Sequence, residues 1–283
     1  VQVTPTRGRR AISYLTLFGG FASTVFWPIG HWLNGAYGWR TTLIIFAAIN
    51  LLVCLPLHWF GLARREAAAS AGSPEAQTAA APSAPPLHGA ARTRGMILFG
   101  LVLAISAFVY GAMAAHLVPL IEASGVSLAA AVTLASLKGF AQVGGRVCEL
   151  VFGRNLNPVT LGRITLAFLP LSFAILLLGG ASYTTAFAFT MVFGIANGLT
   201  TIVRGAVPLA LFGREGYGAV LGILATPYLL LNAVAPMVFA VLAERYGYTV
   251  STQVLLGVSA MAAVALAAMV AWYRRQPAEP ASR

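Results

Sequence analysis

The sequence contains no aspartate, and its seven acidic residues are all glutamates. Charged residues make up only 9% of the 283 residues and hydrophobic residues 59%, whereas a soluble domain has roughly 25% charged residues. So few charges exclude a water-soluble globular protein. The two cysteines, Cys54 and Cys148, lie in separate apolar segments, a placement typical of small packing residues and not of a disulfide or a metal site.

Motifs of the common enzyme classes are also missing. The sequence has no His-Glu-x-x-His, Gly-x-Ser-x-Gly or Cys-x-x-Cys pattern, and no Gly-Lys-Ser or Gly-Lys-Thr phosphate loop. We therefore expect no enzyme activity, no cofactor and no metal site. The net charge of +11 does not indicate nucleic-acid binding, because no basic patch is interleaved with aromatic residues on a soluble face.

What the sequence has instead is long apolar segments. Eight of them span approximately residues 11–33, 41–62, 96–118, 128–152, 164–180, 185–203, 217–242 and 249–272. Each approaches or exceeds the ~20 residues that a helix needs to cross the hydrocarbon core. Only helices and closed barrels satisfy every backbone polar group in lipid, and barrel strands alternate in polarity. The sequence therefore predicts an all-α, polytopic membrane helical bundle with eight transmembrane helices.

Arginines mark one side of this bundle. They lie before the first segment and in alternate gaps after it: Arg7, Arg9, Arg10, Arg64, Arg65, Arg92, Arg94, Arg154, Arg163, Arg214, Arg274, Arg275 and Arg283. The opposite gaps hold only Arg40 and Arg245. Because cytoplasmic loops carry the excess of basic residues, we expect both ends of this chain to be cytoplasmic, in the inner (plasma) membrane of a bacterium.

One gap is long and rich in Ala, Pro, Ser and Gly, with too little apolar bulk to fold alone. It predicts a division into two spans (1–62), a flexible cytoplasmic linker (63–95), six spans (96–274) and a cytoplasmic tail (275–283). An internal similarity explains this division. Pro28 and the later triplet Tyr37-Gly38-Trp39 match Pro236 and Tyr246-Gly247-Tyr248 in spacing to within one residue. Spans one and two thus correspond to spans seven and eight, as in a repeated six-span unit, which predicts four further spans before Val1.

Two segments resemble signatures of the major facilitator superfamily. Gly19-Gly20, Pro28-Ile29-Gly30 and Gly38-Trp39-Arg40 are similar to its Gly- and Pro-rich fifth span. The run from Gly145-Arg146 through Glu149 to Gly153-Arg154 resembles the cytoplasmic acidic-basic loop motif, with Glu149 in place of the usual Asp. The resemblance implies a twelve-helix transporter, of which this chain covers the fifth to twelfth spans, working by alternating access. It also implies conformational gating by Arg146, Glu149, Gly153, Arg154, Pro28 and Pro236.

Lys138 is the main chemical signal. It lies mid-way along the fourth apolar segment, where a charge costs at least ~2.5–3.5 kcal/mol and usually marks a substrate or ion path. Gln142, Arg146 and Glu149 continue the same helical stripe. Because no acidic residue lies mid-span, this stripe favours an anion over an organic cation. A structural partner for Lys138, or snorkelling of its ammonium to the interface, is the alternative.

Other mid-span polar residues are candidates for the same cavity. We expect Tyr110, Asn197, Tyr228, Asn232 and Asn50 to contact substrate together with Lys138 and Gln142; the alternative for each is a helix-to-helix hydrogen bond. A basic residue in the eighth span also resembles the monocarboxylate and oxalate/formate branches.

The predicted function is secondary active transport of a small organic anion, coupled to protons or a counter-anion, by a monomer in the lipid bilayer. The alternatives are a multidrug or hydrophobic-compound exporter of the same superfamily and a non-transporting membrane sensor or scaffold.

Overall fold

A computed structural model describes residues 8–61, 87–153 and 156–275 of the chain. Every regular element in these ranges is helical, which confirms the predicted all-α class. The elements are α1 (Gly8–Ile49), the π-helix η2 (Asn50–Cys54), α3 (Gly89–Ala123), α4 (Leu128–Phe152), α5 (Pro158–Leu178), α6 (Tyr183–Phe212) and α7 (Tyr217–Arg274). Helix α3 starts within the segment assigned to the linker, most of which lies outside the described residues.

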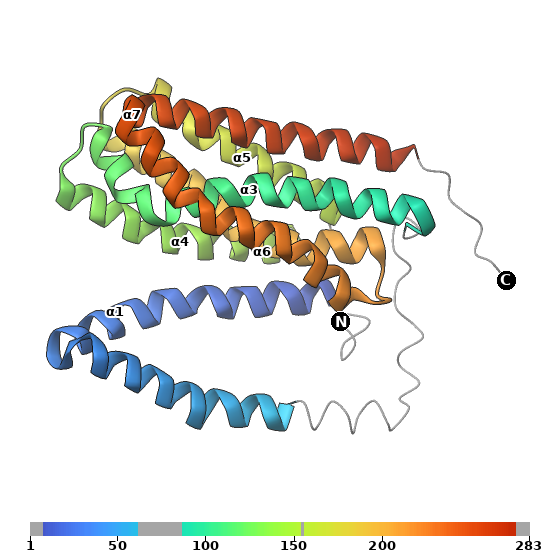
Figure 1. The fold of residues 1–283 in the computed structure, drawn as a ribbon, viewed down its shortest axis with the longest axis horizontal. Coiled ribbons are helices and arrows are strands. Elements are labelled where there is room, and N and C mark those ends of the chain that lie inside the picture. Colours follow the sequence, from blue (N-terminus) through green and yellow to red (C-terminus); the bar gives the residue numbers. More distant parts are fainter. Residues whose placement is uncertain (1–7, 62–86, 154–155, 276–283) are drawn as a thin grey trace. The chain divides into compact units, whose positions relative to one another are not determined.

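The chain forms two compact units, residues 1–80 and 81–283. In the first unit α1 bends at Gly38 into two arms, drawn in blue in Figure 1. The rings of Phe26 and Phe46 meet edge to face across the bend, with centroids 6.0 Å apart. Helix η2 and about two further turns of α-helix continue the second arm to residue 61.

The second unit is a bundle of α3 to α7 (Figure 1). Helix α3 packs along α7, α4 packs on α6, and α5 packs on both α6 and α7. Two clusters of buried apolar side chains hold these contacts together, one around Phe99 and Phe212 and the other around Phe173, Phe189 and Phe193. A polar residue caps the start of each of the next three helices. The side chains of Ser127, Asn157 and Ser182 accept hydrogen bonds from backbone amides in the first turns of α4, α5 and α6, respectively.

Five helices in the described residues are long and apolar enough to cross a membrane. They are Trp32–Gly61, Gly89–Ala123, Pro158–Leu178, Tyr183–Phe212 and Tyr217–Arg274. Eight were predicted. Three predicted spans account for the difference. Lys138 and Gln142 interrupt the apolar sequence of α4, α7 joins two of the predicted spans in one 58-residue helix, and the predicted span 11–33 is not one of the five. The last of the five therefore contains a bend of its own.

That bend repeats the one in α1. Gly38 has φ 75° and ψ 165°, and Gly247 in α7 has φ 76° and ψ 166°. A positive φ is strongly unfavourable for residues with a Cβ atom, so glycine is required at both bends. Four residues later a hydroxyl donates back to the glycine carbonyl in each case, from Thr42 over 2.9 Å and from Ser251 over 2.8 Å. The sequence similarity between these segments therefore corresponds to one shared local geometry.

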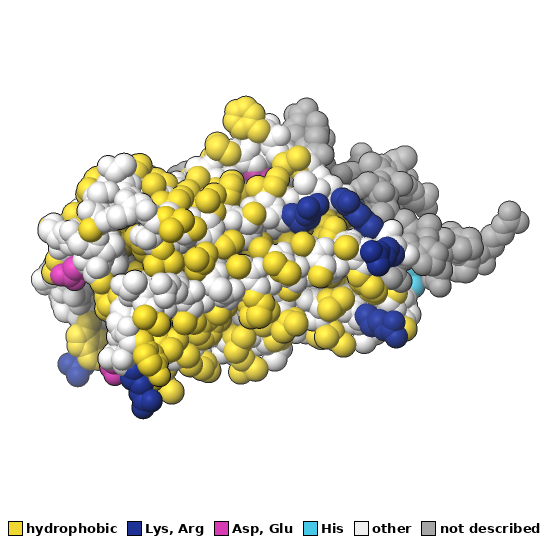
Figure 2. All heavy atoms as spheres, turned by 90° about the horizontal axis from the view of Figure 1, so that it is seen from above, with side chains coloured by type: hydrophobic (Ala, Val, Ile, Leu, Met, Phe, Trp, Pro, Cys, Tyr) yellow, Lys and Arg dark blue, Asp and Glu magenta, His cyan; other side chains and the backbone are white. Residues whose placement is uncertain are grey.

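The surface of the molecule matches a lipid environment. Figure 2 shows a face on which hydrophobic side chains cover the middle, while Lys and Arg side chains lie toward the ends. Many large apolar side chains are exposed, among them Leu101, Phe140 and Met261 at 53%, 62% and 52%. Exposed apolar surface on this scale is stable only against lipid or another apolar partner.

Candidate functional site

The contact between α4 and α6 positions the predicted polar stripe. Gly194 and Gly198 lie one turn apart on α6, the spacing that lets two membrane helices approach closely. A Cβ atom on Gly194 would lie 2.9 Å from the backbone oxygen of Lys138, and one on Gly198 would lie 2.9 Å from the Cα atom of Gln142. The backbone of α4 at Lys138 and Gln142 therefore rests directly on α6.

Lys138 is half-buried on α4. Its aliphatic stem lies against α6, because a Cβ atom on Gly194 would be 3.4 Å from its Cγ atom. Within the described part of the chain, the ammonium has neither a hydrogen-bond acceptor nor a carboxylate partner. The structural partner that sequence analysis left open for Lys138 is thus missing from these residues.

Arg146 lies two turns further along α4 and is only 6% exposed. Its Nε atom donates to the backbone oxygen of Gly198 and to the hydroxyl of Thr201, both over 3.2 Å. Its Nη1 atom is buried and has no acceptor among the described residues. A buried donor without a partner costs about 1–3 kcal/mol, and more when it is charged.

Helices α3 and α7 each make a polar side-chain contact with α6 close to Thr201. The hydroxyls of Tyr110 on α3 and Thr200 are 2.7 Å apart. The guanidinium of Arg204 lies over the ring of Tyr228 on α7, 3.7 Å from its centroid. Helix α6 thus carries a polar band, defined as Thr200, Thr201 and Arg204, which α3, α4 and α7 all contact.

The sequence indicated Tyr110 and Tyr228 as candidates, but neither Thr200 nor the stacking of Arg204 on Tyr228. No sequence signal identifies either contact, since each joins residues on different helices.

Asn232 and Pro236 lie instead in the contact between α3 and α7. The side-chain amide of Asn232 donates to the backbone oxygen of Ala107 over 3.1 Å. A Cβ atom on Gly111 would overlap the backbone of Asn232, so the two helices touch there. The ring of His116 bonds the backbone oxygen of Pro236 over 3.1 Å. These bonds match the helix-to-helix alternative that the sequence left open for Asn232.

The remaining candidates belong to different elements of the chain. Asn197 is half-buried on α6, and Asn50 in η2 is exposed and donates to the backbone oxygen of Phe46 in its own helix over 2.9 Å. Pro28 lies within α1, but its side chain is not among those described, and Arg154 lies outside the described residues altogether.

At the end of α4, Glu149 is 5% exposed and its backbone oxygen accepts from the amide of Gly153 over 2.8 Å. A latch formed by Glu149 and Arg154 stays a prediction.

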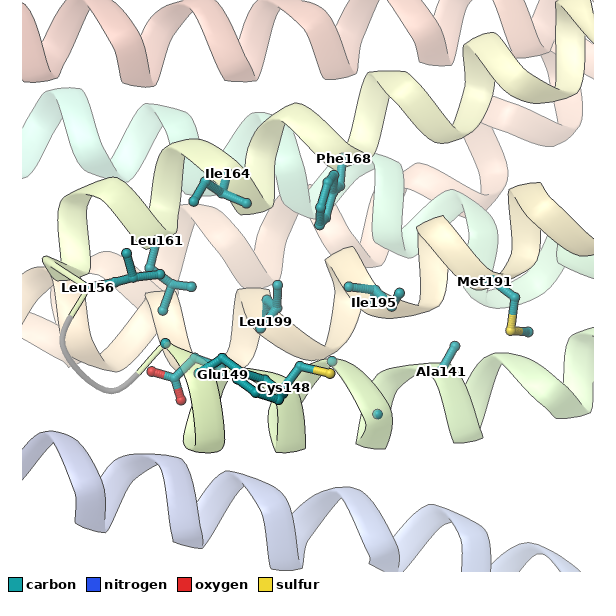
Figure 3. Close-up of a pocket in the computed structure, with 14 residues that line it drawn as sticks. Ala141, Cys148, Glu149, Leu156, Leu161, Ile164, Phe168, Met191, Ile195 and Leu199 are labelled. Carbon is teal, nitrogen blue, oxygen red and sulfur yellow. The ribbon is translucent and has the colours of Figure 1, made fainter.

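A separate groove lies beside this stripe. Residues of α4, α5 and α6 enclose a volume of about 490 Å³, shown in Figure 3. Its lining includes Ala141, Gly145 and Cys148 of α4 but neither Lys138, Gln142 nor Arg146. Glu149 is the one residue of the polar stripe that lines the groove; Lys138, Gln142 and Arg146 lie outside the lining, so the groove is not the predicted anion site. Within the described ranges, no group of three or more His, Cys, Asp or Glu side chains forms a potential metal site.

Comparison with known families decides the class of protein. The family model described as Major Facilitator Superfamily matches residues 2–179. The chain belongs to the major facilitator superfamily. Comparison with curated proteins found no match. This superfamily protein is accordingly a secondary transporter of the membrane with small-molecule substrates, and the prediction that it is not an enzyme is confirmed.

The family match covers the first unit and helices α3, α4 and α5. Lys138, Gln142 and Arg146 lie inside it, whereas the polar band of α6 and both Tyr228 and Asn232 lie beyond its end. Membership of the superfamily establishes transport, and it leaves the branch and the substrate to be inferred from the residues themselves.

Proposed function

We propose that this transporter carries a small organic anion by alternating access and that Lys138 and Arg146 are the cations that bind it. The observation that carries the proposal is the buried Nη1 atom of Arg146, which has no acceptor among the described residues. A carboxylate oxygen would supply that acceptor through a charge-assisted hydrogen bond. Lys138, on the same stripe of α4, offers a second positive charge without a described partner.

The two cations differ in mobility. Arg146 is held by two hydrogen bonds to α6, so its guanidinium has a fixed position. Lys138 has no such bond, and its flexible ammonium is free to follow a moving anion. Eight residues separate them, which is about 12 Å along the helix axis. We therefore assign anion docking to Lys138 and a fixed anion contact to Arg146, with Gln142 between them as a hydrogen-bonding side chain.

The acidic residues support an anionic substrate. The described part of the chain contains Glu122, Glu149, Glu215 and Glu244, all at or beyond the ends of helical segments predicted to span the membrane. An organic cation would have to bind without a mid-span carboxylate from these residues. An anion meets two positive side chains instead.

We assign further substrate contacts and the gating residues from their positions in the sequence. Substrate contacts extend to Tyr110, Asn197, Tyr228, Asn232 and Asn50. Glu149, Gly153, Arg154, Pro28 and Pro236 take part in gating, because Pro frees a backbone carbonyl and allows a helix to bend. Transport is coupled to protons or to a counter-anion. The protein acts as a monomer in the inner membrane of a bacterium, with both ends of this chain cytoplasmic.

Uptake into proteoliposomes tests the anion site. We would measure radiolabelled lactate, formate and oxalate, with either an imposed pH gradient or unlabelled anion trapped inside. Lys138→Ala is expected to abolish saturable uptake, and Lys138→Arg to retain part of it because the charge remains. Thr133→Ala is the matched control on α4, since the hydroxyl of Thr133 is exposed and bonds only the backbone oxygen of Ala129.

Three results would contradict the proposal. Wild-type uptake of an anion that Lys138→Ala leaves unchanged would remove Lys138 from the site. Transport of apolar cations in place of all three anions would show that the protein is a hydrophobic-compound exporter. Binding without transport of any probe would favour a membrane sensor.

A further inference from the structure

The groove of Figure 3 exists because α4 and α5 both pack on α6 but hardly on each other. Ala141, Cys148 and Phe152 of α4 form one wall, and Leu161, Ile164 and Phe168 of α5 form the other. Met191, Ile195 and Leu199 of α6 form the floor. Gly144 leaves part of the α4 wall without a side chain, whereas Gly145 lies against the backbone of α6 at Ile195. A Cβ atom on Gly144 would meet no atom within 4 Å.

The lining is apolar except at one end. Glu149 is its one charged residue, and it lies beside Gly153 and Leu156 where α4 ends. Figure 3 shows the carboxylate of Glu149 at that end and Met191 toward the other. The groove is therefore apolar along nearly its whole length, with a single, largely buried carboxylate at one end.

The rim of the groove is open. Phe152 is 83% exposed, and Leu156 and Ile164 are each 38% exposed. These side chains continue into the exposed apolar surface of α5, which includes Leu171 at 47%. Exposed apolar surface of an integral membrane protein is stable against lipid, so the groove opens onto surface suited to the bilayer. Water entering such an apolar groove would find too few polar partners to remain.

We propose that the groove binds one acyl chain of a bilayer phospholipid. The chain lies over the floor formed by Met191, Ile195 and Leu199, with its methyl end toward Met191 and its glycerol end toward Glu149. A volume of about 490 Å³ is in the range of sites that hold small organic molecules. A flexible hydrocarbon chain suits a lining that offers dispersion contacts and hardly any hydrogen bonds. This inference is independent of the proposed substrate.

Photo-crosslinking tests the site directly. The protein is reconstituted in phosphatidylcholine liposomes that contain a phosphatidylcholine with a diazirine near the methyl end of one acyl chain. After irradiation and proteolysis, mass spectrometry identifies the labelled peptides. We expect adducts on the α6 segment that contains Met191 and Ile195, because a chain in the groove lies against this floor. Adducts confined to exposed rim residues such as Phe152 would overturn the proposal.

A matched pair of variants on α5 separates the groove from the general lipid surface. Ile164→Trp places a large ring in the groove, and Leu171→Trp places the same ring on exposed surface two turns away, outside the lining. We expect Ile164→Trp to lose the α6 adducts and Leu171→Trp to keep them. Equal α6 labelling in both variants would refute an acyl chain in the groove.

Cys148→Phe fills the groove from the opposite wall and replaces Ile164→Trp if that variant does not fold. We expect Cys148→Phe also to lose the α6 adducts. A diazirine-labelled free fatty acid forms the second arm of the experiment. Labelling of α6 by the fatty acid and not by the phospholipid would show that the occupant is not a bilayer lipid.

Discussion

Gly198→Ala is the sharpest test of how α4 and α6 hold the predicted site. The new Cβ atom would lie 2.9 Å from the Cα atom of Gln142 and closer still to its backbone oxygen. Two helix backbones meet here, so no flexible side chain can move aside. The helices must separate, and the hydrogen bonds from Arg146 to the backbone oxygen of Gly198 and to Thr201, both already 3.2 Å long, will stretch or break.

The expected loss of free energy of unfolding combines two destabilising effects with one smaller stabilising effect. Overpacking of a close contact typically costs about 1–3 kcal/mol. Hydrogen bonds from a charged group contribute about 1.5–3 kcal/mol, part of which is lost with the Arg146 contacts. Alanine recovers roughly 0.5–1 kcal/mol because it is a better helix former than glycine. We therefore expect a loss of about 3 kcal/mol in the free energy of unfolding, which corresponds to a decrease in Tm of roughly 6–12 °C.

Thermal unfolding of the purified protein in detergent measures this decrease. Gly139→Ala on α4 is the control, because a Cβ atom there would meet no atom within 4 Å. We expect Gly139→Ala to keep or slightly raise the wild-type Tm. If Gly198→Ala unfolds at the same temperature as Gly139→Ala, α4 and α6 are not in backbone contact and the described position of Arg146 is wrong.

Three further substitutions test individual contacts by the same measurement. Gly247→Ala is expected to cost about 1–2 kcal/mol, because a Cβ atom disfavours the positive φ of that bend; an unchanged Tm would show that the bend is not as described. Tyr228→Leu removes the ring beneath Arg204 and is expected to cost about 0.5–2 kcal/mol, whereas Tyr228→Phe keeps a ring and should cost less. Tyr110→Phe removes the hydrogen bond to Thr200 and is expected to cost about 0.5–1.5 kcal/mol, and a Tm equal to that of the wild type would contradict a buried hydrogen bond there.

Much of the fold was predictable because membrane helices leave strong local signals. Apolar segments of about 20 residues indicate spans whatever their neighbours are. The triplets around Gly38 and Gly247 were recognisable as a pair, and the two glycines share one backbone conformation. The number of spans was harder to predict, since Lys138 and Gln142 make α4 less apolar than α3, α5, α6 and α7.

The candidate site was predictable only in part. The spacing of Lys138, Gln142 and Arg146 places them on one stripe of α4 in any helix. That Arg146 is fixed to α6 depends on the close approach that Gly198 allows. The apolar groove beside the stripe had no sequence signal at all, because it is a gap between helices that do not pack on each other.

Sequence alone determined that this chain is an all-α membrane protein and that its one mid-span ammonium lies on a polar stripe, because both follow from hydropathy and helical periodicity within single segments. Tertiary structure alone decided which helices carry the partners of Arg146, Tyr110 and Tyr228. Those contacts depend on how separate helices approach one another, and that approach is set by small residues and packed rings across the bundle.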